Sequence, residues 1–223
     1  MASKDMKKLS ALLVALGLLA GVTACTSAPT APEGDGPVVA FYGDSYTSGM
    51  GASDPSKRWS TIICEQRGWA EFNPSVVGLG FVNNRQVAGD GDLPSLIIDQ
   101  DPSIVIVTMG LNDAFSFDVA ASEIKQQIAA DLERFSTALP DARIIVVEPF
   151  WHADDRPESL ETIAGWVRGA AADIDADYIA GASRWLQGHP EWMSWDRLHP
   201  NDEGYAVLAS RMDEELTRLG LPG

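Results

Sequence analysis

The chain has 223 residues, of which 45% are hydrophobic and 22% are charged, and its formal net charge is −16 at pH 7. This length is enough for one domain with a sizeable hydrophobic core. The strong acidity argues against nucleic acid as a partner and against electrostatic attraction to anionic lipid.

The first 25 residues predict a secretion signal rather than part of the fold. Three lysines precede an apolar run over residues 9–22, which is too short for a comfortable transmembrane helix. The run ends in Val-Thr-Ala-Cys at residues 22–25, which resembles the lipobox of bacterial lipoproteins. We therefore expect Cys25 to be acylated and the protein to be extracytoplasmic and anchored to the cell membrane. The alternative is ordinary cleavage after Ala24, which would give a secreted protein.

Residues 26–36 (TSAPTAPEGDG) are rich in proline, glycine and small residues, and they predict a flexible tether. Residues 37–223 are predicted to form the folded domain. Because the first 25 residues carry three lysines and one aspartate, the rest of the chain has a net charge of −18. Cys64 lies in an apolar run, so we expect it to be a small buried hydrophobic residue.

The first half of the domain alternates apolar runs with helical patterns. The run over residues 38–42 predicts a buried strand, which ends abruptly in Gly43-Asp44-Ser45. The spacing of apolar residues then predicts a helix over 59–67, a strand over 69–77 and a helix over 93–100.

The second half continues this alternation. Residues 104–109 and 142–148 predict central parallel strands buried on both faces, and residues 178–180 predict a short last strand. Between and after them, apolar residues at intervals of three or four predict three longer helices, the last capped by Asn201. Their predicted buried faces are Ile124, Ile128, Leu132, Phe135 and Leu139; Leu160, Ile163, Ala164, Val167 and Ala171; and Tyr205, Leu208, Met212, Leu216 and Leu219.

The order of elements predicts the α/β class, as a three-layer α/β/α sandwich with a mostly parallel sheet of about five strands. In such sheets the functional residues lie at the carboxyl edge of the strands. Each polar motif of this chain falls at a predicted strand end or shortly before the last helix. We therefore expect the motifs to meet at that edge.

Two of these motifs together indicate nucleophilic catalysis. Ser45 follows a strand end, and Pro200 keeps His199 out of helical geometry just before the last helix. Asp196, three residues before His199, is placed to hold one imidazole nitrogen. The other nitrogen would then be free to take a proton from Ser45.

The order of the motifs resembles that of the SGNH hydrolases, also called the GDSL esterase/lipase family. The Gly-x-Ser-x-Gly elbow of α/β-hydrolases is absent, and the serine follows the first strand instead. The resemblance implies a flavodoxin-like fold and an ester hydrolase that needs no cofactor or metal. Four blocks between Phe41 and Leu219 carry it: Gly43-Asp44-Ser45, a glycine at Gly78 or Gly80, Gly110-Leu111-Asn112-Asp113 and Asp196-Arg197-Leu198-His199.

The resemblance also implies a role for each site residue. Ser45 would attack the ester carbonyl, His199 would act as general base and then acid, and Asp196 would orient His199. The oxyanion donors would be the backbone N–H of Ser45, a glycine N–H and the Asn112 amide. We favour Gly78 as that glycine, because the run from Val77 to Phe81 resembles a Gly-Gly-Thr-Gly-Tyr run in related esterases; Gly80 is the alternative.

Five neighbours of these blocks receive other interpretations. Asp44 and Asp113 are expected to hydrogen-bond backbone amides of their turns rather than to react. Tyr46, where the family's short name has leucine, is expected to change the packing behind the nucleophile. Leu79 and Phe81 are expected to make the entrance to the site apolar.

His152 and His189 have no acidic partner at a suitable spacing and are interpreted as loop histidines. Asp154-Asp155 lacks further metal ligands, so no metal site is predicted. Four tryptophans could pack in the core or could form a pocket wall or sugar-stacking platform, and core packing is favoured: Trp151, Trp185, Trp192 and Trp195.

The leading hypothesis is a serine esterase that acts on a small-molecule or glycan ester, either an O-acetyl carbohydrate or a short-chain acyl ester. One alternative is a substrate-binding or scaffolding lipoprotein without turnover. Another is an acyltransferase that uses the same serine. Membrane contact is expected only through the lipid anchor, and the sequence does not predict the oligomeric state.

Overall fold

The structure is a computed structural model that describes residues 31–88 and 92–221. The predicted signal and Cys25 lie outside these residues. Five strands form one fully parallel sheet in the order β2-β1-β3-β4-β5. The strands are β1 Val38–Tyr42, β2 Ala70–Phe72, β3 Ile104–Val107, β4 Arg143–Val147 and β5 Asp177–Ile179.

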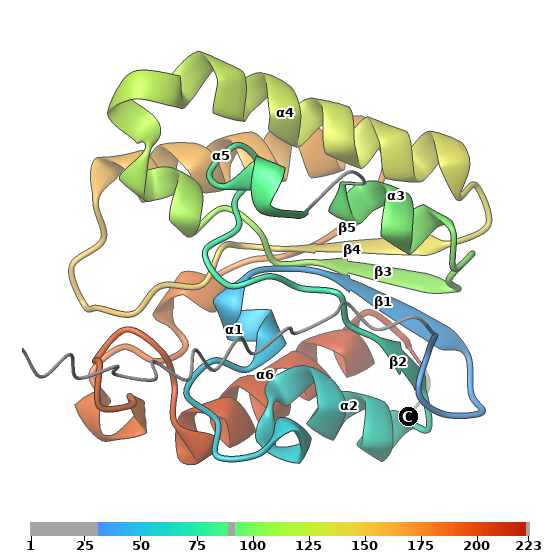
Figure 1. Cartoon of the computed structure of the whole chain (residues 1–223), viewed down its shortest axis with the longest axis horizontal. Helices are drawn as coiled ribbons and strands as arrows, with labels where there is room; N and C mark the ends of the chain where they lie inside the picture. The colour runs from blue at the N-terminus through green and yellow to red at the C-terminus, as the bar shows by residue number, and fades with distance from the viewer. Residues whose placement is uncertain (1–30, 89–91, 222–223) are drawn as a thin grey trace, which may run out of the picture.

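Two layers of helices cover the sheet, with α3, α4 and α5 on one face and α1, α2 and α6 on the other (Figure 1). The predicted three-layer α/β/α fold is therefore confirmed. The helices are α1 Ser45–Ser48, α2 Trp59–Arg67, α3 Leu93–Ile98, α4 Phe117–Ala138, α5 Glu158–Asp173 and α6 Asp202–Arg218. Short 3-10 helices are η1 Pro55–Lys57, η2 Arg85–Ala88, η3 Asn112–Phe115, η4 Ala182–Arg184 and η5 Pro190–Trp192.

Each face of the sheet has its own hydrophobic core. The β3 residues Val105 and Val107 pack toward α3, α4 and α5, whereas Ile106 packs toward α2 and α6. Such two-sided burial is what a continuous β-branched run predicts for a central parallel strand. The predicted cap of α6 is also confirmed, because Asn201 Oδ1 accepts a hydrogen bond from Gly204 N at 3.0 Å.

The strand order places a switch point between β1 and β3. The chain passes from β1 to β2 on one side and returns to β3 on the other, so the carboxyl ends of β1 and β3 are neighbours. In doubly wound sheets this crevice is where ligands bind. Ser45 follows β1 and Asn112 follows β3, so the sheet topology brings two of the predicted blocks together.

Three details differ from the predictions. The strand predicted over residues 69–77 ends at Phe72, because Asn73 turns its side chain onto Thr47 O at 2.8 Å and Pro74 has no N–H to continue a ladder. Ala164 is only partly buried, because it lies at the edge of the apolar stripe of α5. Leu219 is also only partly buried, because it follows the end of α6.

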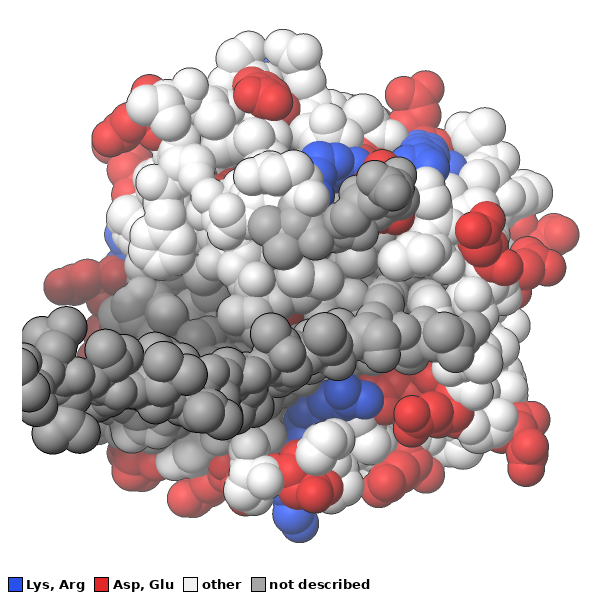
Figure 2. Space-filling model, viewed as in Figure 1, with Lys and Arg blue, Asp and Glu red and all other residues white. Residues whose placement is uncertain are grey.

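The described chain makes its first sheet-like contact before the predicted domain start. Glu33 forms an antiparallel bridge with Glu71, through N–O distances of 2.8 and 2.9 Å. Cys64 is buried, as predicted, and its thiol is free. Among the described residues, no helix combines the length and hydrophobicity needed to cross a bilayer. Figure 2 shows acidic side chains spread over the visible face with few basic ones between them.

Candidate active site

The helix that begins at Ser45 is fixed by its cap. Asp44 is the N-cap of α1, and its Oδ1 accepts a hydrogen bond from Tyr46 N at 2.9 Å. This confirms the predicted structural role of Asp44, because a carboxylate at the N-cap satisfies a backbone donor that the helix leaves open. Ser45 is therefore held at the carboxyl end of β1, where 3% of its surface is exposed.

Tyr46 connects this helix to the turn that carries His199. Its ring is fully buried and stacks on Phe150 with a centroid distance of 5.7 Å, in keeping with the packing role predicted for it. Its hydroxyl also donates to Leu198 O at 2.7 Å. No local sequence pattern indicates this hydrogen bond, because its partners are 152 residues apart.

The predicted Asp-His pair is present. Asp196 Oδ2 lies 2.7 Å from His199 Nδ1, and Asp196 Oδ1 accepts the backbone N–H groups of Leu198 and His199 at 2.9 and 3.0 Å. Burial acts to raise the pKa of Asp196, but these hydrogen bonds outweigh it and lower that pKa to about 2. Asp196 is thus ionised at neutral pH, and Nε2 is the ring nitrogen left for other chemistry.

The structure brings the serine and histidine segments together without a direct bond between the two side chains. The rings of Tyr46 and His199 lie 6.0 Å apart by centroid, and a Cβ placed on Gly51 would lie 3.2 Å from His199 Cβ. Within the described residues, no hydrogen bond joins Ser45 Oγ to His199. Catalytic hydrogen bonds are often long before substrate binds, so this geometry is compatible with proton transfer.

Asn112 lies beside Asp44 at the neighbouring strand end. Its Nδ2 donates to Leu79 O at 2.9 Å and to Asp44 Oδ2 at 3.3 Å. Asp44 is fully enclosed, and this burial raises its pKa from 3.8 to about 7, although the hydrogen bond from Tyr46 N opposes the change. The longer hydrogen bond that the Asn112 amide donates is therefore accepted by the Asp44 carboxyl group, whose pKa is near neutral pH.

Asp113 fixes the loop of residues 77–84 that contains Gly78 and Gly80, here called the glycine loop. This agrees with the structural role predicted for Asp113. Its carboxylate accepts three consecutive backbone N–H groups, from Phe81 at 2.7 Å, Val82 at 2.9 Å and Asn83 at 3.1 Å. A Cβ on Gly80 would lie 2.5 Å from Asp113 Oδ1, so only glycine fits there. The amides that Asp113 holds belong to this loop and not to its own turn.

The two glycines differ in their backbone N–H groups. The Gly80 N–H donates to Asn83 O at 2.8 Å. The Gly78 N–H has no acceptor among the described residues, and Gly78 has a φ of +77°, in the left-handed region that favours glycine. Asn83 and Asn84 donate to Gly78 O at 2.9 and 3.0 Å and so fix the next peptide, between Gly78 and Leu79.

The apolar entrance predicted from Leu79 and Phe81 is wrong. Both side chains are buried in the core on the α3–α5 face, with exposed fractions of 2% and 0%. They point inward because Asp113 draws the loop backbone against the sheet. Val77, at 52% exposure, is the apolar residue that this loop presents outward.

The aromatic residues around the site fall into two groups. Trp151 and Trp185 are buried in the core as favoured, whereas Trp195 is 90% exposed, so core packing is wrong for it. Trp192 is partly buried and stacks on His189, with a centroid distance of 3.6 Å and an interplanar angle of 9°. Trp195 is exposed because it stands in the tight turn that precedes Asp196.

The histidines outside the predicted triad have environments that the sequence did not indicate. His189 Nδ1 lies 2.8 Å from Glu191 Oε1, so the prediction of no suitable acidic partner is wrong for His189. Its partner is only two residues away, in the turn that begins η5. His152 is half-buried against Trp151, and burial followed by the nearby charge of His199 lowers its pKa. His152 therefore lies near the turn that carries His199.

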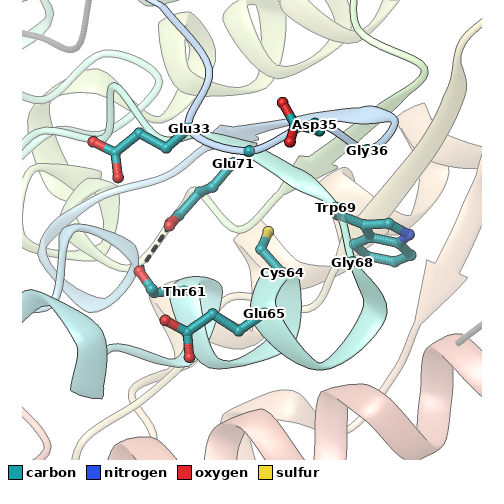
Figure 3. Close-up of a pocket in the computed structure, with 10 residues that line it drawn as sticks. Glu33, Asp35, Gly36, Thr61, Cys64, Glu65, Gly68, Trp69 and Glu71 are labelled. Carbon is teal, nitrogen blue, oxygen red and sulfur yellow. Dashed lines mark hydrogen bonds between the residues drawn. The ribbon is translucent and has the colours of Figure 1, made fainter.

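Two cavities differ in their position relative to these residues. One, of about 450 Å³, lies between residues 33–36, α2 and β2, where Figure 3 shows Glu33, Asp35, Glu65 and Glu71 around it. It is near the amino ends of β1 and β2 and so at the opposite edge from Ser45. The other, of about 560 Å³, borders the Asp196–His199 turn. No group of three or more potential metal ligands is clustered anywhere in the described ranges.

Comparisons with known proteins agree with this arrangement. The model of the GDSL-like lipase/acylhydrolase family matches residues 41–207. A GDSL lipase of Mycobacterium tuberculosis is 24% identical over 193 residues, which cover 78% of this chain and 79% of that protein. The psychrotrophic esterase EstA of Pseudoalteromonas sp. has a TM-score of 0.64 at 16% identity, covering 82% of this chain and 98% of its own. Axe2, an acetylxylan esterase from Geobacillus stearothermophilus, has a TM-score of 0.62 at 18% identity. The match covers 84% of this chain and 96% of the Axe2 chain.

Proposed function

The chain belongs to the GDSL-like lipase/acylhydrolase family, a family of ester hydrolases, and we propose that it cleaves carboxylic esters through an acyl-enzyme on Ser45. The observation that carries this proposal is the fixed histidine. Asp196 holds His199 Nδ1 at 2.7 Å, which leaves Nε2 as the base. Tyr46 supports it, because its ring and hydroxyl keep the histidine turn against the helix that begins at Ser45.

In the first half of the reaction, Ser45 Oγ attacks the acyl carbon and its proton passes to His199 Nε2. The bond from the acyl carbon to the alcohol oxygen then breaks, and the alcohol leaves with the proton from His199. In the second half, water attacks the acyl-enzyme and returns a proton to Ser45 by the same route. Asp196 stays ionised throughout and stabilises the imidazolium that forms.

The oxyanion would be bound by the Ser45 N–H, the Gly78 N–H and the Asn112 amide. The choice of Gly78 is supported by the hydrogen bond that already occupies the Gly80 N–H. For Asn112, the hydrogen bond to Asp44 is longer than that to Leu79. The N–H directed at Asp44 is therefore the one that the developing oxyanion would take.

We propose a short acyl group, such as acetyl, on the substrate. The glycine loop supports this proposal, because Leu79 and Phe81 are buried in the core and offer no apolar wall to a long chain at the entrance. One protein of similar fold is described as an acetylxylan esterase. An O-acetyl carbohydrate and a simple short-chain ester both fit the proposal.

The direct test is hydrolysis of p-nitrophenyl acetate by the wild-type chain and by Ser45→Ala. We expect turnover to fall to background in the variant while its thermal unfolding curve stays within a few degrees of the wild type. A fluorophosphonate probe should label the wild-type chain and leave Ser45→Ala unlabelled. Full turnover in the variant would exclude Ser45 as the nucleophile, and a wild type without turnover or labelling would favour a binding protein.

The location is proposed from the sequence alone: a lipoprotein anchored through Cys25, which lies outside the described residues. The supporting features are the basic start, the apolar run and the Val-Thr-Ala-Cys site. Cys25→Ser should abolish incorporation of radiolabelled palmitate in a bacterial host and release the protein from the membrane fraction. Unlabelled wild-type protein in the culture medium would instead indicate simple secretion.

A further inference from the structure

The cavity of about 560 Å³ beside the catalytic turn is formed by three segments far apart in the chain. One segment follows β4, one follows η4, and the third is the turn that carries Asp196 and His199. Its chemistry-bearing residues are His152, Asp154, Asp155, His189, Met193 and Arg197. The cavity therefore borders the turn that carries the histidine of the proposed mechanism.

Arg197 and Met193 connect the cavity to the catalytic turn directly. Arg197 stands between Asp196 and Leu198, in a left-handed conformation with φ of +55°. A residue other than glycine is uncommon there. In this conformation the side chain of Arg197 leaves the backbone in a different direction from the side chains of its two neighbours. Met193 forms a backbone bridge with Pro200, which closes the turn on the other side of His199. A ligand in the cavity would thus contact the turn that carries His199.

The lining offers hydrogen-bond donors and acceptors that are free to bind a ligand. Among the described residues, the side chains of Arg197, His152 and Asp155 have no hydrogen-bonding or ionic partner. Asp154 uses Oδ1 to accept Gly188 N at 2.7 Å, and its other oxygen remains available. The lining carries one guanidinium and two carboxylates. It therefore offers both hydrogen-bond donors and acceptors, which suit a ligand with several hydroxyl groups, and its excess negative charge disfavours an anionic ligand.

His189 adds a rigid aromatic plate to the same cavity. Glu191 holds its Nδ1 at 2.8 Å, and Trp192 stacks on the ring at 3.6 Å, so its orientation is fixed from two directions. Flat, fixed rings suit the apolar faces of sugars, whereas their rims need hydrogen bonds. A long alkyl chain would instead remove water from Arg197 and both aspartates without replacing their hydrogen bonds, which is costly.

We propose that this cavity binds the sugar portion of an O-acylated carbohydrate, so that the alcohol side of the ester lies between His152, His189 and Arg197. The inference rests on the proposed esterase function. It assigns the cavity to the leaving group, whose oxygen must receive a proton from His199. It also makes Arg197 and His152 determinants of substrate choice.

Binding can be tested apart from turnover in full-length Ser45→Ala, by calorimetric titration with acetylated xylotetraose. Adding Arg197→Asn should weaken binding about tenfold or more, because a charged hydrogen-bond donor is lost. Asparagine tolerates the left-handed conformation, so the turn is kept. His152→Ala should weaken binding in the same direction. Arg211→Ala, which removes an exposed arginine on α6, is the matched control and should leave affinity unchanged.

Kinetics in the active enzyme provide a second readout. With Arg197→Asn or His152→Ala, the ratio of kcat/KM for the acetylated sugar to kcat/KM for p-nitrophenyl acetate should fall about tenfold, mainly through KM. An unchanged ratio together with unchanged affinity would overturn the proposal. A second result would also overturn it: variants that change the preference between acetyl and octanoyl esters but leave kcat/KM for the acetylated sugar unchanged. The cavity would then hold the acyl chain.

Failure of this inference differs from failure of the proposed function. If Ser45→Ala keeps full turnover of both esters, the proposed nucleophile is wrong whatever the cavity binds. If Ser45→Ala is inactive and the cavity variants behave like Arg211→Ala, only the sugar site is wrong. Thermal unfolding of each variant, measured alongside, identifies any loss of binding caused by a loss of folded protein.

Discussion

At the scale of single residues, three aspartates near the catalytic centre have different protonation behaviour because their surroundings differ. Asp196 accepts three hydrogen bonds at the edge of the site and has a pKa of about 2. Burial raises the pKa of Asp113, although three amides oppose the change, and raises that of Asp44 to about 7. Only Asp196 is therefore suited to stabilise a positive charge on a neighbouring imidazole at all working pH values.

Asn112 is the side-chain donor of the proposed oxyanion hole, and its removal tests that role. We expect Asn112→Ala to lower kcat for p-nitrophenyl acetate by about 10²–10³-fold with a smaller change in KM, because the donor acts on charge that develops in the transition state. Initial-rate kinetics on the two proteins would measure this. A change confined to KM would indicate that Asn112 binds the ground state instead.

Asp44 should make the stability of the fold depend on pH. Its pKa is raised on folding from 3.8 to about 7, so the native state binds the proton more tightly than the unfolded state. The resulting stabilisation is fully present below about pH 4 and is lost as pH rises to about 7, to an extent of at most about 4 kcal/mol. Asp44→Asn keeps a good N-cap and removes the titration.

Urea unfolding of the wild type and Asp44→Asn at pH 5 and pH 8 would check this prediction. The variant should lose less free energy of unfolding than the wild type between the two pH values. Equal losses in both proteins would show that Asp44 is not the titrating group. Asp113 contributes in the same direction in both proteins and therefore cancels in the comparison.

At the scale of elements, the glycine loop depends on a single carboxylate for its shape. Asp113→Ala would leave three backbone N–H groups, one buried and two partly buried, without their acceptor. We expect a loss of stability on the order of 3 kcal/mol, together with lower kcat, since the Gly78 N–H would no longer be held in place. Asp141→Ala, at an exposed position in the turn before β4, should affect neither quantity.

Thermal unfolding and initial rates on these two variants, measured below the melting temperature of the weaker one, would separate the effects. A normal kcat in folded Asp113→Ala would mean that the loop keeps its shape without the carboxylate. That result would also remove the argument that Gly78 is a fixed oxyanion donor.

The sequence predicted a helix, strand or cap correctly where hydrophobic periodicity or a short local motif determines it. The β-branched run of β3, the apolar stripe of α4 and the Asn201 cap were predictable because each depends on residues close in the chain. The hydroxyl contact from Tyr46 to Leu198, the clamp of Asp113 on the glycine loop and the inward packing of Leu79 were not. Each of these depends on residues that only the folded chain brings together, and no local spacing indicates them.

At the scale of the whole molecule, the parallel sheet explains why four short blocks meet. Ser45, Gly78 and Asn112 come from segments that follow β1, β2 and β3, and His199 comes from the turn before α6. Because the carboxyl ends of parallel strands share one edge, chain order alone determines which loops are neighbours. The proposed catalytic centre therefore occupies one edge, and the acidic cavity in Figure 3 lies toward the opposite one.

The acidity of the chain should also limit its stability at low ionic strength. The sequence has 32 acidic residues against 16 lysines and arginines, so negative charges outnumber positive ones two to one and repel one another on balance. The Debye length falls from about 30 Å at 0.01 M salt to about 10 Å at 0.1 M, which screens repulsion between exposed charges. We therefore expect the melting temperature at pH 8 to rise by a few degrees between 0.01 and 0.3 M sodium chloride.

The same salt series at pH 5 is the control, because the sequence isoelectric point is about 4.4 and the net charge is then much smaller. The increase should shrink at that pH. A melting temperature that falls with salt at pH 8 would mean that attractive pairs, such as Arg67 with Asp213, outweigh the repulsion. The pair of Arg85 and Asp131 is partly buried, with the carboxylate enclosed, so its contribution should change less with ionic strength than that of an exposed pair.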